Sequence, residues 1–186
     1  MTVTSLDPKT ALIVIDLQKG VVPRPAAPPL DGVVKNAVAL TKAFRGRESP
    51  VVLVNVAGAA PGRTEQPRGH MQLPAGWTDL IPELDRRPQD HVVTKRTRGA
   101  FTNTDLEVHL RGLGVTQVVL AGVATSSGVE VTAHQAYELG FNVTLATDAM
   151  TDGRADAHAY SLTQVFPRLG ETETTREIID LLEKGA

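Results

Sequence analysis

The feature that most constrains the fold is a regular alternation of short apolar runs with longer segments of helical periodicity. The runs at residues 11–15 and 51–56 consist almost entirely of Val, Ile, Leu and Ala, as in strands that are buried on both faces. The first is followed, at 31–45, by a segment whose apolar residues recur at helical spacing. Because strands that alternate with helices pair in parallel, the sequence predicts an α/β fold: a three-layer α/β/α sandwich around a mostly parallel sheet.

The remaining predicted elements continue this alternation to the end of the chain. Further strands are expected at residues 91–94, 115–121 and 141–147, with a short edge strand near Glu171. Helices are expected at 31–45, at about 103–114, at 127–139, at 155–165 and at 174–184. The expected N-caps of the first three are Asp31, Asn103 or Thr104, and Ser127, and Gly114 ends the second. Loops rich in Pro and Gly cover 22–29 and 57–74, and the stretch 57–76 has no assigned role. We expect one domain, 1–186.

Composition excludes several functional classes. The 186 residues include no cysteine, so disulfides, cysteine-bearing zinc sites and a thiol nucleophile are impossible. The net charge of −2 argues against a protein that coats nucleic acid or an anionic membrane. No targeting signal is visible, and no apolar run approaches the roughly 18 residues that a membrane span needs. We therefore expect a cytoplasmic protein.

Ligands of open parallel sheets bind at the carboxyl ends of the strands, so the residues that follow each apolar run are the candidate site. These residues are Asp16 and Gln18, Asn55, Lys95, the stretch 122–128, and Asp148. The stretch 122–128 leads into a helix, whose N-terminus can bind an anion through its free N–H groups. From position alone, Asp16 and Lys95 could be catalytic or could form a structural ion pair.

Four of these segments together resemble the isochorismatase-like hydrolase family, which also includes nicotinamidases and N-carbamoylsarcosine amidases. They are Asp16-Leu-Gln18, Lys95 with Phe101, Gly122-Val-Ala-Thr125-Ser-Ser-Gly128-Val129, and Asp148-Ala149. The resemblance extends from about residue 10 to the end of the chain. It implies the same three-layer sandwich that the alternation predicts.

The resemblance also implies a mechanism, with one departure from the family pattern. Most members use an Asp, a Lys and a Cys; here Asp16 and Lys95 match the first two, and Gly128 stands at the position of the Cys. Isochorismatases themselves also lack this thiol, and their Asp protonates a vinyl ether. The resemblance therefore implies Asp16 as general acid or base with no covalent thiol intermediate. A substrate carboxylate that pairs with Lys95 would push Asp16 towards its protonated form.

Other site residues are assigned by the resemblance or left open. The backbone around Val123, Ala124, Thr125, Ser127 and Gly128 would bind substrate or form an oxyanion hole, with a cis peptide bond between Val123 and Ala124. Phe101 is expected to line the pocket, Gln18 to contact either the ligand or a loop, and Trp77 to cover the site or pack on the surface. Family members commonly assemble, so we expect a homo-oligomer, either a dimer or a tetramer.

The sequence also leaves several alternatives to this interpretation. A nucleophilic Ser126 or Ser127 is disfavoured, because no histidine follows a predicted strand. The five histidines (70, 91, 109, 134 and 158) lack metal-ligand spacing and no G-x-G-x-x-G fingerprint is present, so neither a metal nor a cofactor is expected. Two rival functions remain: a hydrolase or lyase in which Asp16 acts as a base on water, and a catalytically silent binding protein for small molecules.

Overall fold

The computed structural model describes residues 5–22, 25–65 and 73–184. Within them, six strands form one sheet in the order β3-β2-β1-β4-β5-β6. The strands are β1 (Thr10–Ile15), β2 (Val51–Val56), β3 (His91–Lys95), β4 (Gln117–Val123), β5 (Asn142–Thr151) and β6 (Glu171–Glu173). Every neighbouring pair in the sheet is parallel, which confirms the sheet predicted from the alternation.

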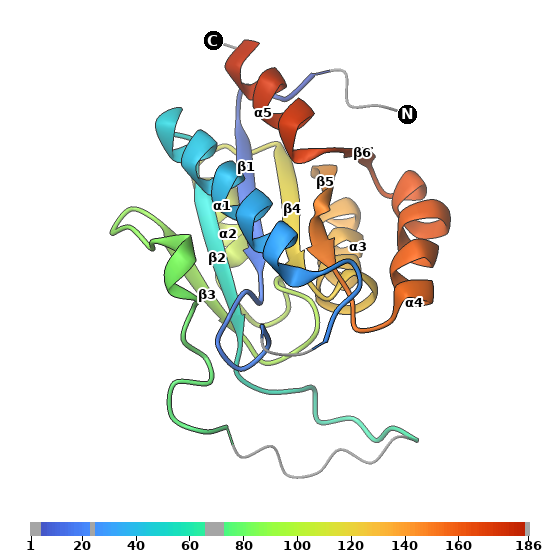
Figure 1. Ribbon diagram of the computed structural model, residues 1–186. Coiled ribbons are helices and arrows are strands. Elements are labelled where there is room, and N and C mark those ends of the chain that lie inside the picture. Colours follow the sequence, from blue (N-terminus) through green and yellow to red (C-terminus); the bar gives the residue numbers. More distant parts are fainter. Residues whose placement is uncertain (1–4, 23–24, 66–72, 185–186) are drawn as a thin grey trace.

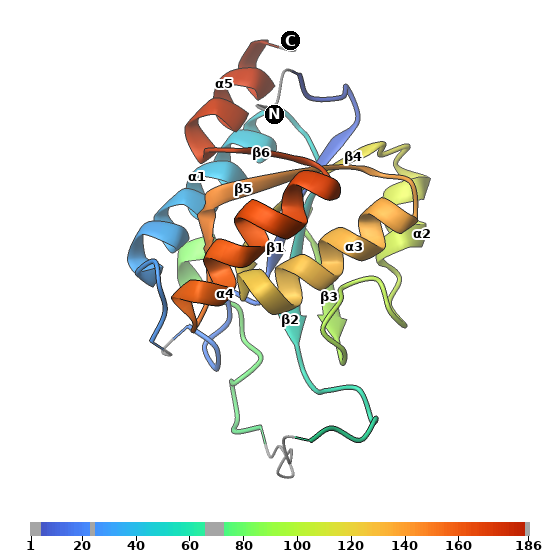
Figure 2. The same cartoon turned by 90° about the vertical axis from the view of Figure 1, so that its right-hand side faces the viewer.

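Helices cover both faces of this sheet, and the predicted three-layer arrangement is confirmed (Figures 1 and 2). One face carries α1 (Leu30–Gly46) and α5 (Thr175–Lys184). The opposite face carries α2 (Leu106–Gly112), α3 (Glu130–Glu138) and the helical segments η3 (Ser161–Val165) and η4 (Phe166–Arg168), which follow α4 (Ala155–Tyr160). None of the helices in the described part of the chain has the length and apolar character needed to cross a membrane.

Two hydrophobic cores explain why the β1 run is continuously apolar. Ala11, Ile13 and Ile15 pack with residues of α2 and α3 on one face of the sheet. Leu12 and Val14 pack with residues of α1 and α5 on the other face. Because successive side chains of a strand point to opposite faces, a central strand buried on both sides requires apolar residues at every position.

The strand order reverses at β1, and this reversal creates the cleft. From β1 the chain adds β2 and β3 on one side and then returns to place β4 on the other. At the carboxyl end of this central pair, Gly122 lies opposite Ile15. Gly122 has φ +116°, and a Cβ atom there would lie 2.0 Å from the carbonyl oxygen of Ile15. Only glycine therefore fits where β1 and β4 meet.

The structure corrects several predicted boundaries. Helix α1 begins one residue early, and Asp31 lies in its first turn instead of capping it. Helix formation after β4 starts with a π-helical turn, η2 (Thr125–Val129), so Ser127 is inside the helix and is not the N-cap. Strand β5 extends to Thr151, and the α-helical part of the predicted 155–165 segment ends at Tyr160.

Candidate active site

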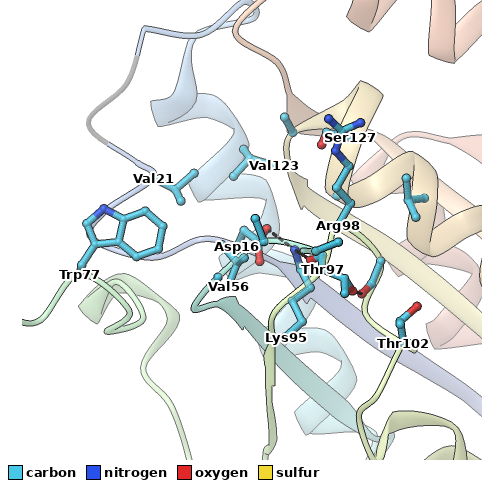
Figure 3. Close-up of a pocket in the computed structure, with 17 residues that line it drawn as sticks. Asp16, Val21, Val56, Trp77, Lys95, Thr97, Arg98, Thr102, Val123 and Ser127 are labelled. Atoms are coloured by element: carbon cyan, nitrogen blue, oxygen red, sulfur yellow. Dashed lines mark hydrogen bonds and ion pairs between the residues drawn. The ribbon is translucent and has the colours of Figure 1, made fainter. Parts of the chain in front are cut away.

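A pocket of about 760 Å³ opens where the carboxyl ends of β1, β3 and β4 meet (Figure 3). Its position at the reversal of strand order is the one expected for a ligand site in a parallel sheet. The described residues that line it are Asp16, Val21, Val56, Gly58, Ala59, Ala60, Trp77, Lys95, Thr97, Arg98, Gly99, Thr102, Val123, Ala124, Ser127, Gly128 and Val131. Most are apolar or small, so the charged side chains stand out: Asp16, Lys95 and Arg98.

Asp16 and Lys95 form a buried ion pair at the base of the pocket. The Lys95 Nζ atom lies 2.7 Å from Oδ2 of Asp16 and also donates to the carbonyl oxygen of Thr97 at 3.3 Å. Lys95 is 1% exposed and Asp16 is 6% exposed. Within the described residues, the second carboxyl oxygen of Asp16, Oδ1, is buried and has no hydrogen-bond partner. Among the described residues, the carboxyl group is thus hydrogen-bonded through Oδ2 alone.

Burial sets the protonation of this carboxyl group. Removal from water raises the pKa of Asp16 to about 6, and the charge and hydrogen bond of Lys95 only partly offset this effect. Desolvation penalises the charged form, whereas the nearby ammonium favours it. Near neutral pH, Asp16 can therefore both hold and release a proton, as a general acid or base requires.

The turn after β4 brings backbone and small side chains against Asp16. The peptide bond between Val123 and Ala124 is cis, as the resemblance implied. A Cβ atom at Gly128 would lie 3.3 Å from Oδ2 of Asp16 and 3.2 Å from the carbonyl oxygen of Val123. Gly128 therefore borders the carboxyl group directly. The N–H group of Ser127 donates to the carbonyl oxygen of Ala124 at 3.0 Å and so is not a free oxyanion donor, although Ser127 lines the pocket.

Trp77 lines the pocket on the side of β2, and Gln18 connects the two from outside the pocket lining. Gln18 is fully buried; its amide accepts from the N–H of Val56 at 2.7 Å and donates to the carbonyl oxygens of Val56 and Trp77, each at 3.1 Å. The sequence left open whether Gln18 contacts the ligand or a loop, and in the structure it contacts a loop. An ideal Cβ at Gly20 would lie 2.2 Å from the Trp77 ring, so the glycine leaves room for this indole at the pocket wall.

Several residues predicted for the site lie elsewhere. Phe101 faces the core, where its ring centroid is 5.9 Å from that of Phe141, and it does not line the pocket. Thr125 is fully buried, with its hydroxyl 2.8 Å from Nδ1 of His158. Asp148 lies inside β5 and accepts two hydrogen bonds from Thr175 at the start of α5. Phe101 and Asp148 are near the site in the chain, but their side chains contact other parts of the fold. The prediction for Thr125 concerns its backbone and stays a prediction.

Asn55, another candidate from the strand ends, also binds a loop through its side chain. It belongs to β2, and its amide donates to the carbonyl oxygen of Thr78 at 2.9 Å. It is absent from the residues that surround Asp16 and Lys95. The role of Asn55 is therefore to hold the chain that leads away from Trp77.

Three polar residues near the site were missed from the sequence. Arg98 lines the pocket three positions after Lys95, and its place just beyond the third apolar run was the available signal. Asp152 accepts from the N–H and hydroxyl of Ser126 at 2.8 and 2.7 Å. His158 contacts Thr125, as described above; nothing in the sequence pattern distinguishes it from a surface histidine.

The described residues provide no candidate metal centre. No group of three or more His, Asp or Glu side chains in this part of the chain could hold a metal ion. The rings of His91 and His109 stack at 3.7 Å, outside the pocket. His70, one of the five histidines, lies outside the described residues.

Taken together, the fold and the pocket define an α/β enzyme whose buried carboxyl–ammonium pair is suited to proton transfer. Comparison with known proteins is more specific. The sequence matches the isochorismatase domain over residues 10–177. The chain therefore belongs to the isochorismatase family, and it is a hydrolase, as are the relatives with named activities.

Similar proteins share the whole fold. YwoC, an uncharacterised isochorismatase-family protein of Bacillus subtilis, is 40% identical over 179 residues, which cover 92% of this chain and 93% of YwoC. The structure of an isochorismatase-family protein from Burkholderia thailandensis superimposes with a TM-score of 0.92 at 41% identity, covering 96% of this chain and 98% of that chain. A probable isochorismatase of Pseudomonas chlororaphis is 28% identical and covers 94% of this chain and 87% of its own length.

Proposed function

We propose that this hydrolase cleaves a small anionic substrate by protonating it from Asp16, with Lys95 holding the carboxyl group in place and with no covalent thiol intermediate. The observation that carries the proposal is the Asp16 carboxyl group, which lines the pocket beside Lys95 and whose pKa burial raises to about 6, as suits a proton donor. Lys95 and Arg98 outnumber Asp16 among the charged lining residues, so the pocket favours a negatively charged ligand.

The absence of a nucleophile favours protonation over covalent catalysis. The chain has no cysteine, and Gly128 occupies the position next to Asp16 where the family pattern has that residue. The hydroxyl of Ser126 is committed to Asp152. His158 contacts the fully buried Thr125 and neither serine, so among the described residues no serine hydroxyl at the pocket has a histidine as its base.

A vinyl ether is the substrate type that this equipment fits. Asp16 would give its proton to the terminal carbon of the double bond, which converts the ether into an oxocarbenium ion. Water then adds to that ion, and the resulting hemiketal separates into a ketone and an alcohol while Asp16 recovers a proton from water. The well-placed carboxyl group would contribute about 10²–10⁴-fold to the rate. No step needs a thiol, a metal or a cofactor.

Relatives in the family act on amides as well as on isochorismate, which keeps a second chemistry open. In that chemistry Asp16, in its ionised form, acts as a base on water. The two differ in the protonation state that is active, and thus in the direction of the pH dependence.

The test separates binding from turnover. Trp77, the only tryptophan of the chain, lines the pocket, so its fluorescence reports ligand binding without any reaction. Isochorismate, nicotinamide and N-carbamoylsarcosine would be screened for binding and for product formation. We expect Asp16→Asn to abolish turnover and to leave binding nearly unchanged. Wild-type binding without turnover of any of the three would instead support the silent binding protein, and full turnover by Asp16→Asn would exclude the proposed role.

The proposal includes three further properties predicted from the sequence. The protein acts in the cytoplasm, as a homo-oligomer, and on a small molecule without nucleic acid. Sedimentation of the purified protein tests the second of these: a monomer at micromolar concentration would contradict it.

A further inference from the structure

Among the described residues that line the pocket, Arg98 is the one cation without a partner. The ammonium of Lys95 is held by Asp16 and by the carbonyl oxygen of Thr97. Within the described residues Arg98, by contrast, makes no hydrogen bond and no ion pair, although it lines the same pocket and is exposed to solvent. Its neighbour Arg96 is also exposed but donates to the carbonyl oxygen of Ala57 and lies outside the pocket lining.

A second free donor lies in the direction in which Arg98 points. In Figure 3 the Arg98 side chain extends towards Ser127, on the side of the pocket opposite Trp77, with Asp16 and Lys95 between these two sides. The hydroxyl of Ser127 likewise has no partner within the described residues. A guanidinium and a hydroxyl group therefore lie on one side of the pocket, and neither is hydrogen-bonded to another residue in the described part of the chain.

An unpaired guanidinium beside a hydroxyl suits a carboxylate. The guanidinium presents its N–H groups as a planar fork that matches the two oxygens of a carboxylate, and such charge-assisted pairs are stronger than neutral hydrogen bonds. We propose that Arg98, together with the Ser127 hydroxyl, binds a carboxylate group of the substrate and determines the preference of the enzyme for carboxylic acids. The inference rests on the proposed function only in that the bound carboxylic acid is also the substrate. The carboxylate site itself follows from the positions of Arg98 and Ser127 in the pocket.

The assignment leaves the ion pair at the base of the pocket intact. A substrate carboxylate on Lys95 would have to displace Asp16 or share its 2.7 Å contact, at a lysine that is only 1% exposed. Displacement is not needed for proton donation, because burial already raises the pKa of Asp16. With the carboxylate held at Arg98, the reacting part of the substrate can lie in the pocket beside Asp16.

The test measures carboxylate recognition directly by titration of Trp77 fluorescence. The probes are benzoate, 3-cyclohexene-1-carboxylate and pyruvate, each beside its neutral primary amide. We expect wild-type protein to bind at least one of these acids more tightly than its amide. Arg98→Gln should lower the affinity for that acid by about tenfold or more, because a charged hydrogen bond is lost only for the acid. The affinity for the amide should change by less than about twofold. Ser127→Ala should lower the affinity for the acid by a smaller factor.

Matched variants make the result decisive. Arg96→Gln removes a neighbouring, likewise exposed charge from outside the pocket lining and should leave all affinities unchanged. Equal binding of acids by Arg98→Gln and wild type, an equal loss in Arg96→Gln, or no carboxylate preference in wild type would each overturn the inference. Failure here is separable from failure of the proposed function: Arg98→Gln tests affinity, whereas Asp16→Asn tests turnover at retained affinity.

Discussion

The ammonium of Lys95 lies 2.7 Å from one carboxyl oxygen of Asp16, while the other oxygen of that carboxyl group has no partner among the described residues. Oδ2, the paired oxygen, fixes the orientation of the side chain. Oδ1 is buried, and among the described residues no hydrogen bond offsets its removal from water. Because the pair is buried, the pKa of Asp16 rises in spite of the neighbouring positive charge.

The first prediction concerns the pH dependence of the reaction. If the protonated form of Asp16 is active, kcat/KM should be constant below a pH of about 6 and should fall tenfold for each pH unit above it. At two units above the pKa, about one hundredth of the acid form remains. Steady-state rates from pH 4.5 to 8.5 provide the measurement. A profile that rises through the same range would assign Asp16 as a base.

The second prediction concerns Lys95→Met. The charge and hydrogen bond of Lys95 lower the pKa of Asp16, so their removal should move the falling limb of the rate profile to higher pH. The folded state would then retain a proton that the unfolded chain releases near pH 3.8, so stability should decrease as pH rises through the folded pKa.

Urea unfolding of Lys95→Met at pH 5 and at pH 8 measures this effect. Loss of one partner of a buried ion pair costs about 3–5 kcal/mol when the remaining group is charged, and less when it can be neutral. The destabilisation should therefore be larger at pH 8. Lys19→Met, which removes an exposed pair with Asp79, serves as control and should change neither the rate profile nor this pH dependence.

The third prediction concerns Gly128→Ala. The added methyl group would lie 3.3 Å from Oδ2 of Asp16 and 3.2 Å from the backbone oxygen of Val123, which has little freedom to move. We expect a loss of about 1–3 kcal/mol in unfolding free energy and a lower kcat. Gly32→Ala is the matched control: a Cβ there meets nothing within 4 Å inside α1, so stability should rise slightly. Unchanged kcat in Gly128→Ala would show that the space beside Asp16 is not used.

The architecture and the central pair could be predicted because both follow from strand periodicity. Parallel strands end at the same edge of a sheet, so the residues after neighbouring strands come together whatever loops connect them. Asp16 and Lys95 are 79 positions apart in the chain and still meet. No comparable rule predicts in which direction a side chain within a loop points. Phe101 points into the core, whereas the adjacent Thr102 lines the pocket, and nothing in their order indicates which does which.

The sequence places Asp148 directly after the fifth strand, whereas in the structure Asp152 has that position. This difference has a specific structural cause. Between two points of pairing with β4, from Leu120 to Gly122, β5 runs from Leu145 to Met150. The additional residues form an irregularity that turns Asp148 towards α5 and extends the strand. Asp152 then becomes the acidic residue that follows β5. Rules based on apolar runs place the end of the strand too early, because they do not detect such an irregularity.

Asp152 provides the last prediction, because it holds the first turn of the helix that borders the pocket. It is 7% exposed; Oδ2 accepts from the N–H and hydroxyl of Ser126, and Oδ1 accepts from the N–H of Arg154 at 3.1 Å. Asp152→Ala leaves these donors without their acceptor, at about 1–3 kcal/mol for each donor that stays buried. Since Ser127 and Gly128 directly follow Ser126, kcat should fall together with stability. Thermal unfolding and steady-state kinetics measure both, with the exposed Asp156→Ala as a control expected to change neither. A kcat equal to wild type in a destabilised Asp152→Ala protein would limit Asp152 to a role in folding.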